Sequence, residues 1–232
     1  MMEKVVFITG AARGIGLATA KKFAANGWKV VAFYRNSPGP EIENVSYYQL
    51  DVTDWESISR GFETAHRDCR RVDCLINNAG ILLDKRLQGY EREDMENVIK
   101  VNELGVYLCT KKILEMMERG SMVNLCSTAA QAGSMDPIYA ASKGAVWSFT
   151  KSMAMALAPR IRVNCVAPGI VNTDMGNKGW GPSELEQRIA AIPLGKMAEP
   201  EDISAGIYFL ASEEAAHITG TCLDINGGYV LR

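Results

Sequence analysis

Tyr139 and Lys143 stand four residues apart, a spacing that places both side chains on one face of a helix. A phenol with a pKa of about 10 is a weak acid–base group at neutral pH. A nearby ammonium favours the phenolate, so we expect Lys143 to lower the pKa of Tyr139. Tyr139 could then pass a proton to or from a substrate oxygen.

A second pair with the same spacing, Tyr107 and Lys111, shows that the pattern alone is not specific. We interpret that pair as lying on a helix surface. Ser127 distinguishes the first pair, because it ends an apolar run shortly before Tyr139. Ligands of open α/β sheets bind beyond the carboxyl ends of the strands, where a serine hydroxyl could meet a substrate carbonyl. A plain strand-end or capping role is the alternative for Ser127.

Three glycines, Gly10, Gly14 and Gly16, follow the first apolar run and open a helical segment. Glycine has no Cβ, so the backbone can approach a pyrophosphate closely. The helix N-terminus offers free N–H groups and the positive end of the helix dipole. The spacing is GxxxGxG instead of the commoner GxGxxG, and a simple tight turn is the alternative. Its place between a strand and a helix favours dinucleotide binding.

Short apolar runs rich in β-branched residues alternate with longer segments of helical periodicity. The expected strands are Lys4–Thr9, Lys29–Tyr34, Ser46–Leu50, Cys74–Asn77, Met122–Cys126, Arg162–Ala167 and Cys222–Ile225. The expected helices are Gly14–Asn26, Trp55–Asp68, Arg92–Arg119, Ile138–Ala158, Glu184–Ala191 and Glu201–Ala211. This alternation predicts a single α/β domain, residues 1–232, with a seven-stranded parallel sheet and helices on both faces.

Two segments interrupt the alternation. Pro38, Gly39 and Pro40 lie between the second and third strands and cannot hold a regular helix. We therefore expect the helix between these strands to be missing or vestigial. Residues 172–182 contain three glycines and Trp180, and a long irregular segment of this kind is typical of a binding loop.

The composition excludes several classes of protein. The 232 residues include 25 basic and 27 acidic ones, a net charge of -2 with neutral His, which argues against a nucleic-acid-binding surface. No apolar run reaches the roughly 18 residues that span a bilayer. We see no signal-peptide pattern and expect a cytoplasmic protein. The six Cys form no CxxC pair and the two His have no metal-ligand spacing, so we expect buried free thiols and no metal site.

Taken together, these motifs resemble the short-chain dehydrogenase/reductase family over nearly the whole chain. The matching segments are TGAARGIG after the first strand, NNAG after the fourth, VNELG in the next helix, IRVN and PG in the sixth strand and just beyond it, and DINGG at the seventh. The resemblance implies a three-layer, doubly wound Rossmann fold.

The resemblance also implies a catalytic tetrad of Asn102, Ser127, Tyr139 and Lys143. Tyr139 would be the general acid when a ketone is reduced, and Ser127 would hydrogen-bond the carbonyl oxygen. Lys143 would bind the nicotinamide ribose and tune Tyr139, while Asn102 would anchor a water leading to Lys143. Hydride chemistry belongs to the cofactor, and the protein supplies position and field.

The same resemblance implies a set of cofactor-binding residues that mostly follow the strand ends. They are Gly10, Arg13, Gly14, Ile15, Gly16, Arg35, Asp51, Val52, Asn78, Ala79, Gly80, Tyr139, Lys143, Pro168, Gly169, Val171 and Thr173.

Three positions bear on the choice of cofactor. Tyr34 ends the second strand, where NAD-preferring members carry an acidic residue for the ribose 2′-hydroxyl. Arg13 and Arg35 match basic positions of NADP-preferring members, and two guanidinium groups can clamp a 2′-phosphate. We therefore expect NADP(H) in preference to NAD(H). Solvated surface arginines are the alternative.

The C-terminal segments IPLGKM, EPEDI, FLAS and ITG resemble those of the 3-oxoacyl-acyl-carrier-protein reductases. This implies NADPH-dependent reduction of a ketone on an acyl thioester, with acyl carrier protein as a partner. The expected substrate contacts are Ser127, Gln131, Met175 and Trp180. An NAD(P)-dependent sugar, polyol or steroid alcohol dehydrogenase is the alternative enzyme. A dinucleotide-binding regulatory protein is the alternative outside the enzymes.

The helix Ile138–Ala158 is apolar around much of its circumference. Its apolar residues include Val146, Trp147, Phe149, Met153 and Met155. Burial on the sheet accounts for only part of them, and an exposed apolar patch implies a partner. Because the family pairs its corresponding helices, we expect a homotetramer built on two-fold axes.

Overall fold

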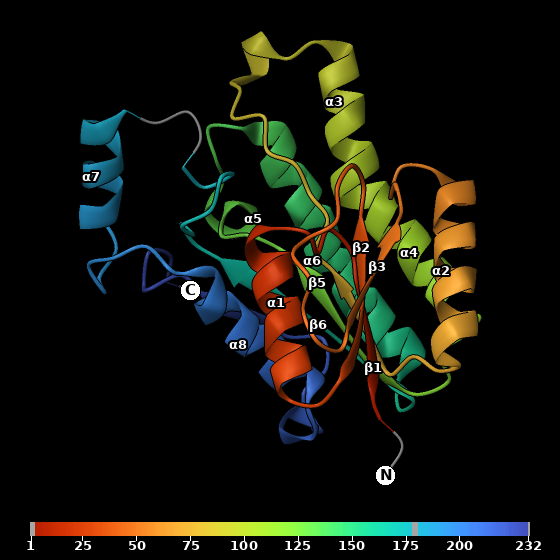
Figure 1. The fold of residues 1–232 in the computed structure, drawn as a ribbon. Helices are drawn as coiled ribbons and strands as arrows, with labels where there is room; N and C mark the ends of the chain where they lie inside the picture. Colours follow the sequence, from red (N-terminus) through yellow and green to blue (C-terminus); the bar gives the residue numbers. More distant parts are fainter. Residues whose placement is uncertain (1–2, 178–180, 232) are drawn as a thin grey trace.

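The computed structural model describes residues 3–177 and 181–231. Seven parallel strands form its sheet (Figure 1). They are β1 (Val5–Ile8), β2 (Lys29–Tyr34), β3 (Val45–Gln49), β4 (Cys74–Asn77), β5 (Gly120–Leu125), β6 (Ile161–Pro168) and β7 (Cys222–Ile225). Their order is β3-β2-β1-β4-β5-β6-β7. The order reverses between β1 and β4, and ligands of such sheets bind at that point.

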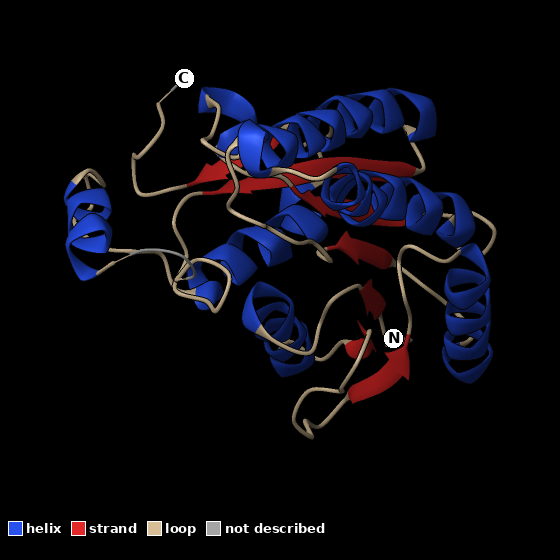
Figure 2. Ribbon diagram, turned by 90° about the horizontal axis from the view of Figure 1, so that it is seen from above, coloured by secondary structure: helices blue, strands red, loops and turns tan. Residues whose placement is uncertain are grey.

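Helices cover both faces of the sheet, which gives the predicted three-layer fold (Figure 2). One face carries α1 (Gly14–Ala25) and α8 (Pro200–Ala211), and the other carries α2 (Trp55–Cys69), α4 (Gly105–Ile113) and α6 (Pro137–Leu157). The remaining helices are α3 (Arg92–Ile99), α5 (Ala129–Ala132) and α7 (Pro182–Ala190), together with short 3-10 turns at Leu87–Gly89 and Glu213–Ala215. Within the described part of the chain, no helix has the length and hydrophobicity to span a membrane.

Each face of the sheet has its own apolar core. On the α2 face, the ring of Phe7 lies 5.4 Å from that of Phe33 and 5.5 Å from that of Phe62. On the α1 face, the rings of Phe23 and Trp28 pack edge-on at 5.1 Å. A strand that is covered on both faces has a continuous run of apolar residues, and such runs allowed the strands to be located from the sequence.

The connection between β2 and β3 is a coil, which confirms the predicted absence of a helix there. Tyr47 of β3 packs against the core on the α1 face. The coil runs so close to this ring that a Cβ added to Gly39 would lie 3.0 Å from its Cζ. Glycine at this position therefore lets the coil cover the sheet where a helix would otherwise lie.

The prediction of one helix over Arg92–Arg119 is wrong, because the structure divides this segment. A π-helical turn, Lys100–Leu104, joins α3 to α4, which ends at Ile113. In this turn the N–H of Gly105 donates to the carbonyl of Lys100. Turns of this kind are rare and often lie at functional sites. Asn102 is buried within it.

Candidate active site

A cleft of about 1590 Å³ opens beyond the carboxyl ends of the strands. Every residue predicted to bind the cofactor lines this cleft except Gly16. Ser127 and Met175, predicted to contact substrate, line it as well, whereas Asn102 and Gln131 do not. Trp180, the fourth predicted substrate contact, lies outside the described residues.

The glycine-rich turn between β1 and α1 forms one wall of the cleft. Gly10 and Gly14 have left-handed φ values of 66° and 54°, which residues with side chains rarely adopt. A Cβ on Gly16 would collide with the carbonyl oxygen of Gly10. Gly16 therefore shapes the turn from behind. No side chain caps α1, so its first N–H groups are available to a pyrophosphate.

Hydrogen bonds tie this turn to the segment after β4. Asn78 Nδ2 donates to the carbonyl oxygens of Thr9 and Gly10 at 3.0 and 2.9 Å. The Thr9 hydroxyl accepts from the N–H groups of Asn78 and Ala79 at 3.0 and 3.1 Å. A Cβ on Gly10 would lie 2.9 Å from the Cα of Ala79. These contacts fix the floor of the cleft where the strand order reverses.

Three side chains predicted to do chemistry line the cleft together. Tyr139 and Lys143 lie one turn apart in the first half of α6, and Ser127 follows β5. Lys143 Nζ donates to the carbonyl of Leu125 at 2.8 Å and lies 5.8 Å from the centre of the Tyr139 ring. Lys143 is 4% exposed, whereas Tyr139 is partly exposed to the cleft. A phenol thus faces the cleft with a buried amine close to it.

Burial raises the pKa of Tyr139 from 10.0 to about 12, against the lowering effect of its hydrogen bond with the Ser127 hydroxyl. The net pKa of Tyr139 is therefore raised and not lowered as expected, because burial outweighs the groups that favour the phenolate. Burial also lowers the pKa of Lys143 to about 8, which weakens its effect on the phenol. Tyr139 consequently carries its proton at neutral pH, the form that a general acid needs.

Asn102 lies behind the cleft wall and connects two segments of the site. Its Oδ1 accepts from the N–H of Ile81 at 2.8 Å, and its Nδ2 donates to the carbonyl of Ile81 at 2.9 Å. Nδ2 also donates to the hydroxyl of Ser142 at 3.2 Å, and that hydroxyl donates to the carbonyl of Tyr139 at 2.7 Å. Asn102 therefore reaches Tyr139 through Ser142, a link that the sequence did not reveal.

Asp136 is a buried carboxylate of the site that the sequence analysis missed. It caps α6: its Oδ1 accepts from the N–H of Tyr139 at 2.9 Å and from the hydroxyl of Tyr90 at 2.7 Å. Its Oδ2 accepts from the N–H of Asp84 at 3.0 Å, a residue with a left-handed φ of 56°. The sequence signal was available, because Asp before Pro137 is typical of a helix start.

The basic residues are spread along the part of the cleft near β2. Arg13 Nη1 lies 3.6 Å from the carboxylate of Asp174, and both side chains are exposed, so this ion pair is weak. Arg35 is exposed and lines both the cleft and a smaller polar pocket of about 560 Å³. Arg60 of α2 lines the same small pocket. Nothing in the sequence around Arg60 marks it as a residue of the site.

Gln131, predicted to contact substrate, does not line the cleft in this structure. Its Nε2 donates to the carboxylate of Asp224 at 2.6 Å and lies 3.8 Å from the sulfur of Cys222. The side chain is therefore held toward β7. Met175, by contrast, lines the cleft and is 37% exposed.

These features fit a nicotinamide dinucleotide. An open glycine turn at an uncapped helix N-terminus suits the pyrophosphate, and the cleft continues from there to Tyr139 and Lys143. One continuous cleft thus joins the glycine-rich turn to the phenol of Tyr139.

Comparisons with known proteins agree with this geometry. A family model described as enoyl-(acyl carrier protein) reductase matches residues 10–230. The chain is 40% identical over 242 residues to the 3-oxoacyl-[acyl-carrier-protein] reductase FabG of Thermotoga maritima, with 98% of each protein covered. A glucose/ribitol dehydrogenase of the short-chain dehydrogenase/reductase class from Brucella melitensis superposes with a TM-score of 0.94 at 28% identity, over 100% of both chains. The 3-ketoacyl-(acyl-carrier-protein) reductase of the same organism, solved with NADH, gives a TM-score of 0.91 at 32% identity, over 98% of each chain.

Proposed function

The chain belongs to the short-chain dehydrogenase/reductase family, and from that premise we propose that it reduces the ketone of a 3-oxoacyl thioester on acyl carrier protein, with NADPH as reductant. Membership makes it an oxidoreductase that uses a nicotinamide dinucleotide. The observation that carries the proposed chemistry is the phenol of Tyr139, which lines the cleft together with Ser127 and Lys143. The proposed substrate also implies a cytoplasmic location.

When bound, the nicotinamide supplies a hydride to the substrate carbonyl carbon. In the proposed reaction the phenol of Tyr139 donates its proton to the carbonyl oxygen as negative charge develops there. The hydroxyl of Ser127 hydrogen-bonds the same oxygen and stabilises that charge. The ammonium of Lys143 then stabilises the phenolate that proton transfer leaves behind.

Tyr139 must regain its proton after each turnover, and the proposed route passes Lys143. Gly80 runs beside this route: a Cβ there would lie 3.4 Å from Asn102 Oδ1 and 3.6 Å from Lys143 Nζ. Asn102 would hold a water in this region, as the family resemblance implies. Its two hydrogen bonds to Ile81 and its link to Ser142 keep it in position for that role.

The proposed preference for NADPH depends mainly on Arg35. Its guanidinium lines the cleft next to Tyr34, which offers no carboxylate to a ribose 2′-hydroxyl. A 2′-phosphate at this place would accept charge-assisted hydrogen bonds from Arg35. It would also compete with Asp174 for Arg13, whose exposed ion pair at 3.6 Å is easily replaced. Arg60 adds positive charge from the adjoining pocket.

A sugar or polyol dehydrogenase is the second candidate. The glucose/ribitol dehydrogenase of Brucella melitensis supports it through a TM-score of 0.94. The acyl-thioester reductase is the stronger proposal, because sequence identity rises to 40% with the Thermotoga relative. Many chemistries share one fold, so overall shape alone does not identify the substrate.

One substrate panel separates the two candidates. The purified chain is given 3-oxoacyl groups on acyl carrier protein and on a small thiol, and a steroid ketone, each with NADPH and with NADH. Glucose and ribitol, which a dehydrogenase would oxidise, are each given with NADP⁺ and with NAD⁺. We expect the largest kcat/KM with the 3-oxoacyl thioesters and NADPH. A larger kcat/KM for glucose or ribitol would overturn the proposal. Tyr139→Phe serves as the control for the site, because it lacks the proposed proton donor.

The homotetramer stays a proposal, supported by apolar side chains on α4, α6 and the adjoining π turn. Met155 is 85% exposed on α6, and Leu104 at the end of the π turn is 41% exposed. The rings of Tyr107 and Phe149 lie 4.4 Å apart and join α4 to α6 as one surface. Light scattering should give the mass of four chains, and the mass of one chain would contradict the proposal.

A further inference from the structure

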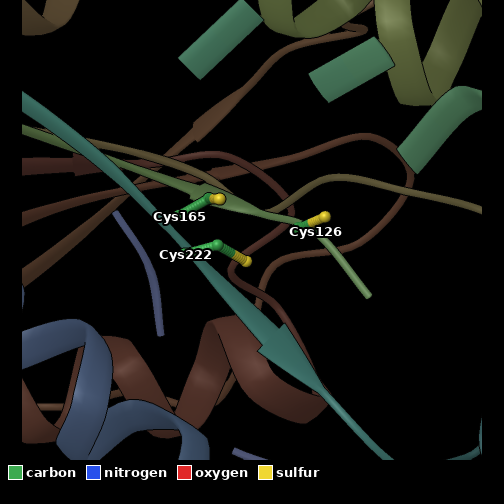
Figure 3. Close-up of side chains that lie close together, drawn as sticks. All are labelled: Cys126, Cys165 and Cys222. Atoms are coloured by element: carbon green, nitrogen blue, oxygen red, sulfur yellow. The ribbon is translucent and has the colours of Figure 1, made fainter. Parts of the chain in front are cut away.

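Three cysteines that are distant in the sequence meet beside the active site. Cys126 follows β5, Cys165 lies in β6 and Cys222 begins β7. Their sulfurs all lie within 4.8 Å of one another, and all three residues are buried. Figure 3 shows the three side chains gathered from neighbouring segments of the sheet. The pairing of Cys165 with Cys222 across β6 and β7 fixes two of them in register.

This set of donors consists of sulfur only. Soft thiolate ligands select soft metal ions such as zinc, copper(I) and their heavier relatives over magnesium or calcium. We propose that Cys126, Cys165 and Cys222 bind one soft divalent metal ion through their three sulfurs. A metal–sulfur bond of about 2.3 Å places three such sulfurs about 4 Å apart. The cluster therefore closes on an ion with a small inward rotation of its side chains.

An ion can enter this site from the cleft, because Cys126 lines it. On binding, the three thiols release three protons and form three metal–sulfur bonds, with no change of oxidation state. Three thiolates and a divalent ion together carry one negative charge. The side chain of Lys143 interacts electrostatically with Cys126 and Cys165, so its ammonium compensates that charge. Water from the cleft can fill a fourth position on the ion.

The site is coupled to the reactive groups through Cys126. Its sulfur lies 3.3 Å from the carbonyl oxygen of Lys143, to which the thiol donates. Ser127 follows Cys126 directly in the chain. Drawing the Cys126 sulfur toward an ion breaks the contact with Lys143 and shifts Ser127. Occupancy of the site should therefore slow carbonyl reduction.

The test uses Cd²⁺ as the probe on the full-length, reduced chain under anaerobic conditions. We expect one ion per chain, an ultraviolet thiolate-to-metal absorption band and three protons released. Cys165→Ala and Cys222→Ala should each weaken binding at least ten-fold. Cys109→Ala is the matched control, because Cys109 is equally buried but lies on α4, outside the cluster. One equivalent of Cd²⁺ should slow carbonyl reduction by the wild type and leave the rate of Cys165→Ala unchanged.

X-ray absorption on the wild type counts the sulfur ligands without any variant, which keeps the test decisive if a variant does not fold. Three sulfurs at one ion support the proposal. Binding below one ion per chain, fewer than three sulfurs, or an absorption band that persists in Cys165→Ala and Cys222→Ala would overturn it. In that case the three thiols only fill the core.

Discussion

The backbone N–H of Tyr139 donates a hydrogen bond of 2.9 Å to the carboxylate of Asp136, the residue that caps α6. The proposed proton donor is thus held in place by the first turn of its own helix. The same carboxylate accepts from Tyr90 and from the N–H of Asp84. Asp136 therefore joins the start of α6 to the segment that follows β4, and we regard it as a positioning residue.

Replacing Asp136 by Ala should lower both stability and kcat. Loss of a helix cap costs about 0.5–2 kcal/mol, and a buried donor left without its acceptor costs about 1–3 kcal/mol more. Asp136→Asn retains an acceptor oxygen for Tyr139 but sets an NH2 group against the N–H of Asp84, so it should restore only part of the stability and of kcat. Chemical unfolding and steady-state kinetics on both variants check this. Unchanged kcat in Asp136→Ala would show that the cap does not position Tyr139.

Removing the hydroxyl of Tyr139 should abolish most of the turnover and spare cofactor binding. General acid catalysis contributes about 10²–10⁴-fold, so kcat of Tyr139→Phe should fall by at least the lower figure. Tyr107→Phe is the matched control, because Tyr107 has the same spacing to a lysine but donates to Glu103 at 3.2 Å on another helix. Stopped-flow reduction and fluorescence titration of NADPH separate the two effects. Full turnover in Tyr139→Phe would remove the phenol from the mechanism.

The raised pKa of Tyr139 predicts how the phenol responds to pH. Burial favours its neutral form and moves its pKa from 10.0 to about 12; Ser127 opposes this rise, and Cys126 and Asp136 add to it. Lys143, whose Nζ lies 5.8 Å from the ring centre, is the cation facing it. In the unfolded chain the phenol loses its proton near its ordinary pKa of 10.0. The contribution of this group to the free energy of unfolding is therefore fully present below that pH and is lost as the pH rises through about 12. An ultraviolet titration of wild type minus Tyr139→Phe should show no phenolate below pH 10.0. A phenolate at neutral pH would contradict the structure.

Arg35→Ala should reduce the preference for NADPH over NADH. A hydrogen bond to a charged group contributes about 1.5–3 kcal/mol, which corresponds to roughly a 10- to 150-fold change in the ratio of the two dissociation constants. Arg60→Ala should change the ratio of the two dissociation constants in the same direction but less than Arg35→Ala does, because Arg60 lines only the adjoining pocket. Arg67→Ala, on the exposed side of α2, should leave it unchanged. Equal affinity of the wild type for both cofactors would reject the assignment.

The positions of the strands follow closely from the sequence, because a strand buried on both faces leaves a continuous apolar run. The coil between β2 and β3 was equally predictable from Pro38 and Pro40, which exclude a helix. The division of the helix Arg92–Arg119 was not. The hydrophobic periodicity of a helix continues across a single π turn, so the sequence does not reveal the turn. The apolar residues Met116 and Met117 also continue the helical pattern beyond Ile113, where α4 ends.

Local motifs predicted that Ser127, Tyr139 and Lys143 lie together, and the structure places all three in the cleft, but their electrostatics were not predictable. Spacing places Lys143 near Tyr139, but the degree of burial that decides both pKa values depends on the whole fold. Gln131 shows a second limit: its segment faces the cleft, yet its side chain is held by Asp224 of β7, far away in the sequence. Contacts of this kind need three-dimensional coordinates.

The π turn at Lys100–Leu104 affects the fold and the position of Asn102 in different ways. It contains one residue more than an α-helical turn, so deleting a residue here would merge α3 and α4 into one regular helix with both inward faces preserved. The amide at position 102 would then miss its partners on Ile81. We therefore expect a one-residue deletion at this point to preserve the fold and to impair the proposed role of Asn102.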